Sequence, residues 1–386
     1  MKRIYYLFFI WIGYLCLSNC SNNKQGEEVF RRVYPLKETR IVTDLSPFVA
    51  ELELIDMSSD SVYLSGIIKM LATSEKYFFL SGGVVFSRSK NDKDIKRIGR
   101  IGRGPGEYLI IKDIALNFEK TELWCLDVYN SILRYDINEG FFLGSIKTGK
   151  DIAHAEGIVP MADSRFGVYV PNPLMKDMAD DNLSFYCLRI FDYNGKERGR
   201  EIPWKDYNID AGFSSPVSFS DNDICILSPE SSSCPSVLFE EGREKEQLFF
   251  DFGRKNVPFR YSFRAGDDPM LMLEDMFKED YYKLISYVFL YDRGLYFRAY
   301  GENSSLWNFI IPKNNEKGIR WCSIGGVTPP VSAIAVENGA LFFSYDDYGL
   351  VSSIEEEPDP LKKCVMETFG IPHSNKPCLI KVRFNV

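Results

Sequence analysis

Histidine is almost absent from this chain, and several common catalytic patterns are missing altogether. Among 386 residues there are two histidines, His154 and His373. A zinc site built from several histidines is therefore excluded. No His-Glu-x-x-His, Gly-x-Ser-x-Gly or EF-hand pattern occurs, and no glycine-rich stretch continues into Gly-Lys-Ser/Thr. The motifs predict no catalytic residue, no metal site and no cofactor, although a carboxylate-rich Ca²⁺ site stays open.

The cysteines also lack a recognisable framework. There are nine, none of them in a Cys-x-x-Cys spacing, and an odd number lies beyond the N-terminal segment. Cys125, Cys187 and Cys225 lie inside apolar, strand-like runs, where cysteine behaves as a small hydrophobic residue. Cys364 and Cys378 flank one late insertion and are the single candidate disulfide pair of an exported protein.

Long hydrophobic runs are missing except at the N-terminus. Residues 4–17 are apolar, follow Lys2 and Arg3, and are too short to span a membrane comfortably. The sequence Leu-Ser-Asn-Cys at 17–20 resembles a bacterial lipobox. These features predict a signal peptide over 1–19, a lipidated Cys20, and a tether and leader over 20–48, with an ordinary secretory peptide as the alternative. No Asp follows Cys20 directly, which by enterobacterial analogy favours the outer membrane.

Positive charge is in deficit. The net charge is −8, and removal of the signal peptide takes away Lys2 and Arg3 and no acid, which leaves −10. This balance disfavours nucleic acid and anionic lipid as partners. Contact with a membrane is therefore expected through the lipid anchor only.

What the chain does have is a repeat. An apolar strand ending in an aromatic residue recurs six times, and a second β-rich run precedes it. The aromatic residues are Phe86, Tyr135, Phe191, Phe239, Phe309 and Phe384, and the preceding runs are 77–80, 123–126, 166–170, 224–227, 295–299 and 341–344. Such a pair is the middle hairpin of a blade. The sequence predicts an all-β, six-bladed β-propeller of four-stranded antiparallel blades over 49–386.

The first and last units suggest how the ring closes. Residues 50–55 form an extra strand before the first unit, and the sixth unit lacks an outer strand. We expect these residues to pair with the strand that ends at Phe384, because closure protects sheet edges that an open sheet would expose.

Two insertions, at about 255–283 and 346–377, lengthen the last two repeats. Asp268-Pro269 and Asp359-Pro360 are suitable helix-capping pairs, so each insertion predicts a short helix, the first over 270–278.

A glycine-rich turn at 98–108 separates the first two units. Its segment Gly-Arg-Gly-Pro-Gly-Glu-Tyr, at 102–108, resembles the signature of the six-bladed, NHL-like β-propeller lipoproteins of the Bacteroides group. Residues 32–43, 52–64 and 123–135 resemble further segments of that family, and the similarity covers about the first third of the chain. The resemblance implies the fold and an exported location, but no agreed activity.

Propeller geometry indicates a candidate ligand surface. The loop from the outer strand of one blade to the inner strand of the next is expected to open near the central channel. On the predicted register these loops hold Arg103, Glu107, Tyr108, His154, Glu156, Phe213, Ser214 and Thr328. Mixed polar and aromatic groups suit a glycan, peptide or protein partner. Glu107 and Tyr108 also have a structural interpretation, as a cap for loop amides and as packing between blades.

Two classes of function remain on this evidence. One is a non-catalytic binding protein, and the other is a propeller enzyme, such as a lyase or hydrolase of an exported polymer. The fold alone does not choose between them. The shortage of histidine favours the binding protein.

Overall fold

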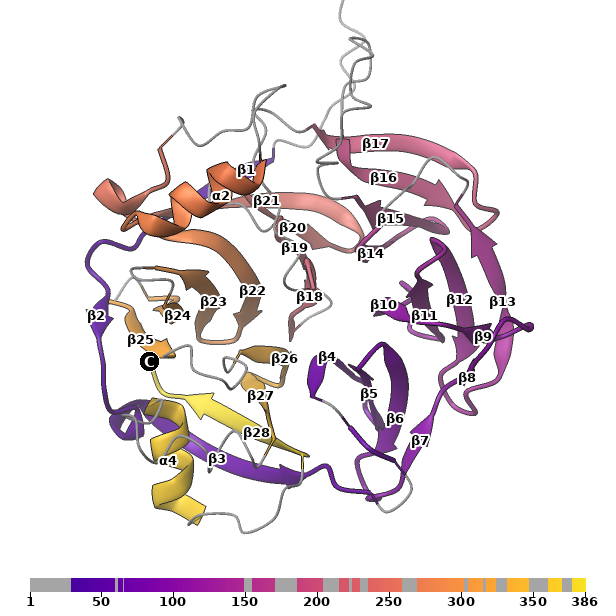
Figure 1. The fold of residues 1–386 in the computed structure, drawn as a ribbon, viewed down its shortest axis with the longest axis horizontal. Helices are drawn as coiled ribbons and strands as arrows, with labels where there is room; N and C mark the ends of the chain where they lie inside the picture. Colours follow the sequence, from indigo (N-terminus) through magenta and orange to yellow (C-terminus); the bar gives the residue numbers. More distant parts are fainter. Residues whose placement is uncertain are drawn as a thin grey trace, which may run out of the picture. The chain divides into compact units, whose positions relative to one another are not determined.

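Antiparallel hairpins account for most of the structure, which is a computed structural model. It describes residues 29–59, 62–64, 66–148, 155–170, 186–203, 215–221, 224–229, 235–258, 269–301, 305–314, 317–323, 332–346, 360–369 and 377–386. The chain divides into two units, Met1–Phe30 and Arg31–Val386. The second unit is a ring of six blades around a channel (Figure 1).

Each blade is a meander of four strands, from the innermost at the channel to the outermost at the rim (Figure 1). Blade 1 is β4 (Ile67–Ala72), β5 (Lys76–Ser81), β6 (Val84–Ser89) and β7 (Ile95–Arg97). Blade 2 is β10 (Ile111–Leu116), β11 (Glu122–Asp127), β12 (Ser131–Asp136) and β13 (Phe142–Lys147). Blade 3 is β14 (Gly157–Met161), β15 (Arg165–Tyr169), β16 (Tyr186–Asp192) and β17 (Glu197–Pro203).

The second half of the ring repeats the pattern. Blade 4 is β18 (Val217–Phe219), β19 (Cys225–Leu227), β20 (Ser236–Glu240) and β21 (Arg243–Asp251). Blade 5 is β22 (Lys283–Tyr291), β23 (Gly294–Tyr300), β24 (Leu306–Pro312) and β25 (Ile319–Ser323). Blade 6 is β26 (Ala333–Glu337), β27 (Ala340–Asp346), β28 (Pro377–Phe384) and β3 (Val49–Asp56). The predicted six-bladed propeller is confirmed.

The aromatic repeat marks the same strand in every blade. Phe86, Tyr135, Phe191, Phe239, Phe309 and Phe384 all lie on the third strand, and none is more than 3% exposed. The β-rich runs that precede them form the second strands. Each aromatic ring packs against a neighbouring blade, which is why the repeat persists where the rest of the sequence diverges.

The ring closes as predicted. Strand β3 pairs with β28 in antiparallel register, from Asp56 opposite Cys378 to Val49 opposite Phe384. The first chain segment of the propeller therefore supplies the outermost strand of the last blade, and no edge of that blade's third strand is left open.

The leader contributes two more strands. Strand β1 (Phe30–Pro35) adds to β21, the outer edge of blade 4, and β2 (Arg40–Ile41) pairs in parallel with β25 of blade 5. Leu36 between them is 1% exposed and packs in the core between those blades. These two blades are thus five-stranded rather than four-stranded.

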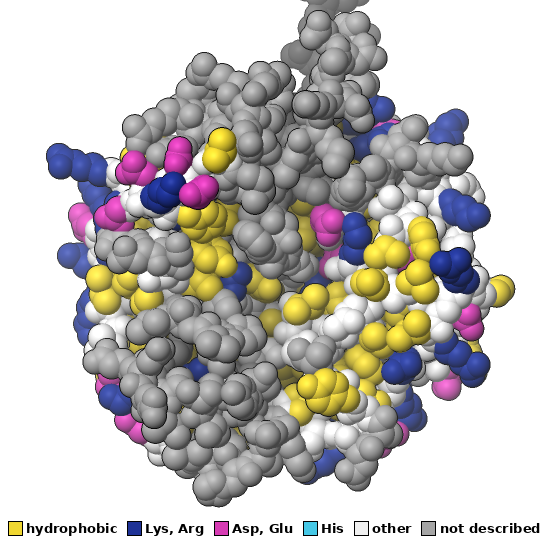
Figure 2. All heavy atoms as spheres, viewed as in Figure 1, with side chains coloured by type: hydrophobic (Ala, Val, Ile, Leu, Met, Phe, Trp, Pro, Cys, Tyr) yellow, Lys and Arg dark blue, Asp and Glu magenta, His cyan; other side chains and the backbone are white. Residues whose placement is uncertain are grey.

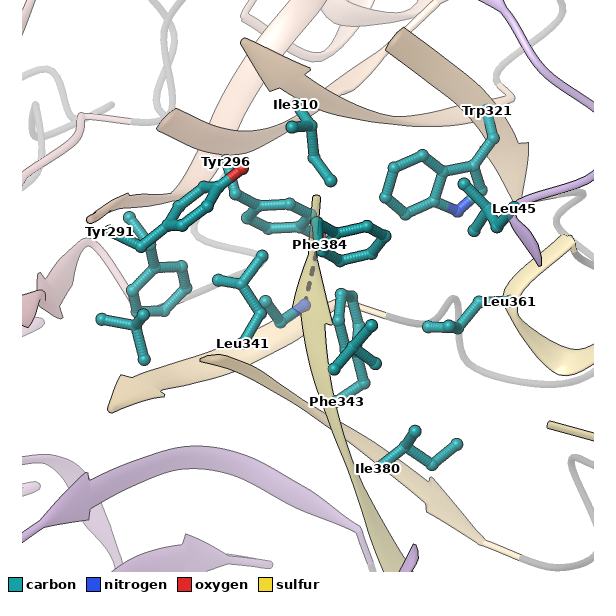
Figure 3. Close-up of a cluster of buried hydrophobic side chains, with 14 of the residues drawn as sticks. Leu45, Tyr291, Tyr296, Ile310, Trp321, Leu341, Phe343, Leu361, Ile380 and Phe384 are labelled. Atoms are coloured by element: carbon teal, nitrogen blue, oxygen red, sulfur yellow. Dashed lines mark hydrogen bonds between the residues drawn. The ribbon is translucent and has the colours of Figure 1, made fainter. Parts of the chain in front are cut away.

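Blades pack through aromatic contacts, as the junction of blades 5 and 6 shows (Figure 3). The rings of Tyr296 on β23 and Phe343 on β27 meet edge to face, with centroids 5.8 Å apart. Trp321 on β25 lies 6.1 Å from Phe384 on β28. The Tyr296 hydroxyl donates to Asn308 Oδ1, so its polar end is satisfied inside the core.

Both predicted helices occur. Helix α2 (Pro269–Lys278) starts at the predicted proline, and α4 (Pro360–Phe369) does the same in the second insertion. Along the chain, α2 precedes β22, and α4 lies between β27 and β28. Both helices lie on the face of the ring that is toward the viewer in Figure 1, which we call the upper face. Leu361 and Val365 of α4 are buried in the core of blade 6.

The candidate disulfide between Cys364 and Cys378 does not form, because both residues are thiols. Cys378 instead packs with Leu361 and Val365 in the hydrophobic cluster of blades 5 and 6. In this position it acts as a small apolar side chain. Burial raises the pKa of the Cys364 thiol, which lowers its reactivity.

Candidate functional site

The glycine-rich turn folds back on itself through Glu107. Strand β8 (Arg100–Ile101) pairs in parallel with β9 (Glu107–Tyr108), and Glu107 Oε2 accepts a hydrogen bond from the Gly104 amide at 2.8 Å. Tyr108 is 2% exposed, and its hydroxyl donates to the Ile98 carbonyl at 2.8 Å. Burial raises the pKa of Tyr108 to about 12. Glu107 therefore accepts a hydrogen bond from a loop amide and Tyr108 is buried, as expected if both residues have a structural role.

The turn lies at the outer side of blade 2. Gly106, at φ +72°, packs so closely on Phe142 of the outermost strand β13 that a Cβ would lie 2.7 Å from its ring. The Tyr135 hydroxyl donates to the Gly106 carbonyl at 3.0 Å. The expectation that Arg103 and Glu107 border the channel is therefore wrong for this turn, because the chain follows the rim before it crosses to β10.

Glu156 is the predicted site residue that does lie beside an innermost strand. Its Oε1 accepts a hydrogen bond from Lys112 Nζ of β10 at 2.9 Å, and the same ammonium donates to the Ala155 carbonyl at 3.1 Å. This ion pair links the innermost strand of blade 2 to the segment that directly precedes the innermost strand of blade 3. The structure does not bring Glu156 together with Arg103 or Glu107. Other predicted residues lie outside the described residues, namely His154, Phe213, Ser214, Thr328 and the lipidation site Cys20.

A second ion pair lies deeper in the channel wall. Lys69 Nζ of β4 donates to Asp113 Oδ1 of β10 at 2.5 Å, and both side chains are almost fully buried. Asp113 Oδ2 accepts from the Ile158 amide at 2.9 Å, and Ser215 Oγ lies 3.2 Å from Oδ1. Burial raises the pKa of Asp113, while Lys69 and the backbone amide act in the opposite direction. One carboxylate thus ties four chain segments together.

Sequence reasoning missed this pair. Lys69 is the single charge in the run 67–72, Asp113 follows Lys112 in the run 111–116, and the two residues are 44 positions apart. The available signal was the charge of Lys69 at a core position of an innermost strand, since such residues are rarely buried without a partner.

The space beside this pair is small. A cavity of about 10 Å³ lies between Lys69, Ser215 and Tyr287, and the Lys69 ammonium stands 4.9 Å from the centre of the Phe219 ring. Beyond Phe219, on the face opposite α2 and α4, an apolar cavity of about 280 Å³ opens between Met70 and Leu116.

Apolar side chains gather on the upper face over blades 1 and 2 (Figure 2). Tyr63 is 89% exposed, Tyr129 61%, Ile110 52% and Ile68 45%. Tyr63 lies in the loop that leads into β4, and Tyr129 lies in the turn between β11 and β12. We call these four residues the apolar surface. Large exposed apolar groups in one region are typical of an interaction site.

The apolar surface rests on a rigid base. The Ile110 carbonyl accepts a hydrogen bond from the Val128 amide at 3.2 Å, and the next amide, of Ile111, donates to the Gly83 carbonyl at 2.9 Å. The turns of blades 1 and 2 are thereby fixed to each other. Lys112, which forms the ion pair with Glu156, follows Ile110 of this surface by two residues in the sequence.

Within the described ranges, no three His, Cys, Asp or Glu side chains are grouped in a way that could hold a metal ion. Neither α2 nor α4, nor any other helix in the described part of the chain, has the length and apolar character needed to cross a bilayer.

Comparison with known families agrees with this architecture. A family model described as a six-bladed β-propeller matches residues 23–317. The chain belongs to this family. The match includes the leader strands β1 and β2, the first four blades and the first three strands of blade 5. No match was found among curated proteins.

One solved structure supports the propeller fold, and a second is reported with a much weaker similarity. A Bacteroides fragilis protein whose description proposes that it is exported has a TM-score of 0.68 at 13% identity, over 92% of this chain and 100% of that one. PorZ, a surface component of the type-IX secretion system of Porphyromonas gingivalis, has a TM-score of 0.34 at 13% identity, over 76% of this chain and 36% of PorZ. At 13% identity the similarity to the Bacteroides fragilis protein concerns the fold alone, and nothing is inferred from PorZ.

Proposed function

We propose that this propeller is an exported lipoprotein of the outer membrane that binds a glycan, peptide or protein partner on its upper face, without catalysis. The observation that carries the binding proposal is the apolar surface, in which two tyrosines are more than half exposed. Tyrosine combines a large apolar ring with a polar end and is common where partners bind.

The location rests on the N-terminal sequence. Lys2 and Arg3, the apolar stretch at 4–17 and the cysteine at position 20 match the order of a lipoprotein signal. The similar Bacteroides fragilis protein is itself described with proposed export, which agrees with this assignment. We also assign the repeat to the NHL-like type, on the resemblance of residues 102–108.

Replacing Cys20 with Ser tests the anchor. We expect the wild-type protein to sediment with outer membranes and the Cys20→Ser variant to be released, because several acyl chains anchor a protein firmly and the variant cannot carry them. Fractionation and the intact mass of the mature protein measure this. If the variant stays in the membrane with an unchanged mass, the anchor is not at Cys20.

Removing the two exposed tyrosines tests the binding surface. A soluble form without the signal peptide is screened against a glycan and peptide panel, and the Tyr63→Ser/Tyr129→Ser variant is titrated with each molecule that binds. We expect at least tenfold weaker binding, since buried aromatic anchors each contribute more than about 1 kcal/mol at interfaces. The melting temperature should not change, because both side chains are largely in solvent.

Phe141 provides the matched control. It is 67% exposed but lies in the turn between β12 and β13, at the end of the blade away from the apolar surface. Phe141→Ser should bind as the wild type does. Equal losses in both variants, or no panel molecule bound by the wild type, would remove the support for this surface.

A further inference from the structure

A cleft of about 840 Å³ lies between blades 4 and 5, and residues 32–39 of the leader form part of its wall. Much of its polar lining comes from turns that join the first strand of a blade to the second, or the third strand to the fourth. In blade 2 a turn of this kind, between β12 and β13, lies at the end of the blade away from the apolar surface. The cleft therefore opens on the face opposite α2 and α4. Its volume is typical of small-ligand sites.

Two carboxylates lie at the inner end of the cleft. Asp221 and Asp292 follow β18 and β22, the innermost strands of their blades (Figure 1). Asp221 accepts hydrogen bonds from the amides of Asn338 and Gly339, at 2.8 and 2.7 Å. A Cβ on Gly339 would collide with Asp292 Oδ1, so both carboxylates face the same glycine. Asp292 forms no ion pair within the described ranges, and two neighbouring negative charges favour a bound cation.

The outer end of the cleft is basic. Lys313 and Lys317 lie between β24 and β25, the third and outermost strands of blade 5, and Lys37 lies in the leader. In the part of the chain that the structure describes, lysines without an ion pair outnumber such acids in this half of the lining by four to two. They are Lys37, Lys245, Lys313 and Lys317, against Glu38 and Glu240. The cleft is thus negative toward the channel and positive toward the rim.

The leader is held in place on both sides of Lys37. The Leu36 amide donates to the Asp251 carbonyl of blade 4 at 2.8 Å, and the Arg40 amide donates to the Gly318 carbonyl of blade 5 at 2.8 Å. Leu36 is 1% exposed, which fixes the segment further. The outer wall of the cleft is therefore formed before any ligand arrives, and a preorganised site loses less free energy on binding.

Between the two charged ends the lining is apolar. Its side chains belong to the hydrophobic cluster of blades 4 and 5 and are Leu238, Leu290, Leu295 and Ile311. In blade 5 the two ends are separated by two to three strand spacings of about 4.8 Å, or roughly 10–14 Å. An extended peptide advances about 3.4 Å per residue, so three or four residues cover this distance.

We propose that the cleft binds a peptide of three or four apolar residues with free ends. Its amino group lies beside Asp221 and Asp292, and its carboxylate lies among Lys37, Lys313 and Lys317. Both ends then make charge-assisted hydrogen bonds, which are the stronger kind, while the apolar side chains cover the leucines between them. A neutral glycan offers neither terminal charge, so the charge pattern favours a peptide.

Tetrapeptides with Ala, Val, Leu or Phe at their central positions test this site in the soluble form without the signal peptide. We expect members of this set to bind in calorimetric titration and to raise the melting temperature. N-acetylation or C-amidation of a peptide that binds should each weaken it at least tenfold, because each removes one charged end. A dipeptide should also bind at least tenfold more weakly, since it cannot reach both ends.

Variants at each end connect the peptide groups to the cleft. Asp292→Asn should weaken the free peptide at least tenfold but leave the N-acetylated peptide unchanged, because the amino group has lost its partner in both cases. Lys313→Gln/Lys317→Gln should act in the same way on the free and C-amidated peptides. The melting temperature of the unliganded protein should not change, since none of these side chains forms an ion pair among the described residues.

Blade 3 provides matched controls. Asp163 lies in the turn between β14 and β15 and Lys196 in the turn between β16 and β17, the counterparts of the cleft turns, and neither lines the cleft. Asp163→Asn and Lys196→Gln should bind the peptides as the wild type does. Equal binding of free and end-blocked peptides, or no binding of any peptide in the set, would refute the site. Tyr63→Ser/Tyr129→Ser should leave tetrapeptide binding intact, so this proposal and that of the apolar surface fail separately.

Discussion

Replacing Lys69 with Met is expected to destabilise the propeller by about 3–5 kcal/mol, because it leaves the Asp113 carboxylate buried without its counter-charge. Asp113 is 0% exposed, and the 2.5 Å contact with Lys69 is the one ion pair it makes among the described residues. The loss should be large because Asp113 also holds the Ile158 amide, so its displacement would loosen blades 1, 2 and 3 together. Urea unfolding of both proteins measures the difference.

The loss of stability in Lys69→Met should change with pH in one direction. Burial raises the pKa of Asp113 above its usual value, and Lys69 opposes that shift. Without Lys69 the pKa must rise further. A carboxyl whose folded-state pKa is raised loses its contribution to stability as the pH rises through that pKa. The deficit of Lys69→Met should therefore be smallest at mildly acidic pH, where Asp113 is protonated, and should grow toward alkaline pH.

A double variant serves as the control. Lys69→Met/Asp113→Asn removes both charges but keeps an acceptor oxygen for the Ile158 amide, so most of the lost stability should return. If the single variant loses less than about 1 kcal/mol, or if its deficit is the same at all pH values, the pair does not hold the blades as we infer.

Removing strand β3 is expected to open the ring. A chain that begins at residue 57 lacks the strand that pairs with β28 from Asp56 to Val49, so β28 becomes an exposed edge. We expect the melting temperature to fall by about 10 °C or more, as a loss of several kcal/mol would produce in a protein of this size, together with aggregation. Thermal unfolding and size-exclusion chromatography measure both effects.

Two longer chains show which part of the N-terminus closes the ring. A chain that begins at residue 29 keeps every strand and should match the parent protein. One that begins at residue 44 loses β1, β2 and the buried Leu36 but keeps β3, so it should be less stable yet monomeric. If the chain from residue 57 is as stable and as monomeric as the chain from residue 44, closure by β3 is unimportant.

The turn at 102–108 shows how far sequence reasoning reached. The glycines and Pro105 predict a shaped turn, and the contacts of Glu107 and Tyr108 agree with their structural interpretation. Its position at the rim, against Phe142, could not be predicted. Residue spacing reports that a loop joins two blades, but the path of the loop depends on which side chains of the next blade it meets.

The sequence by itself determined the repeat, the six third-strand aromatic residues, the two helices and the closing strand. These depend on local patterns, such as alternating apolar residues, a capping Asp-Pro pair or a strand in excess at one end and missing at the other. Only the tertiary structure decided that Lys69 meets Asp113 across 44 residues and that the leader completes blades 4 and 5. The physical reason is that a charge in an apolar run needs a partner, but its energy depends on distance and burial, which are set by the packing of blades around the channel.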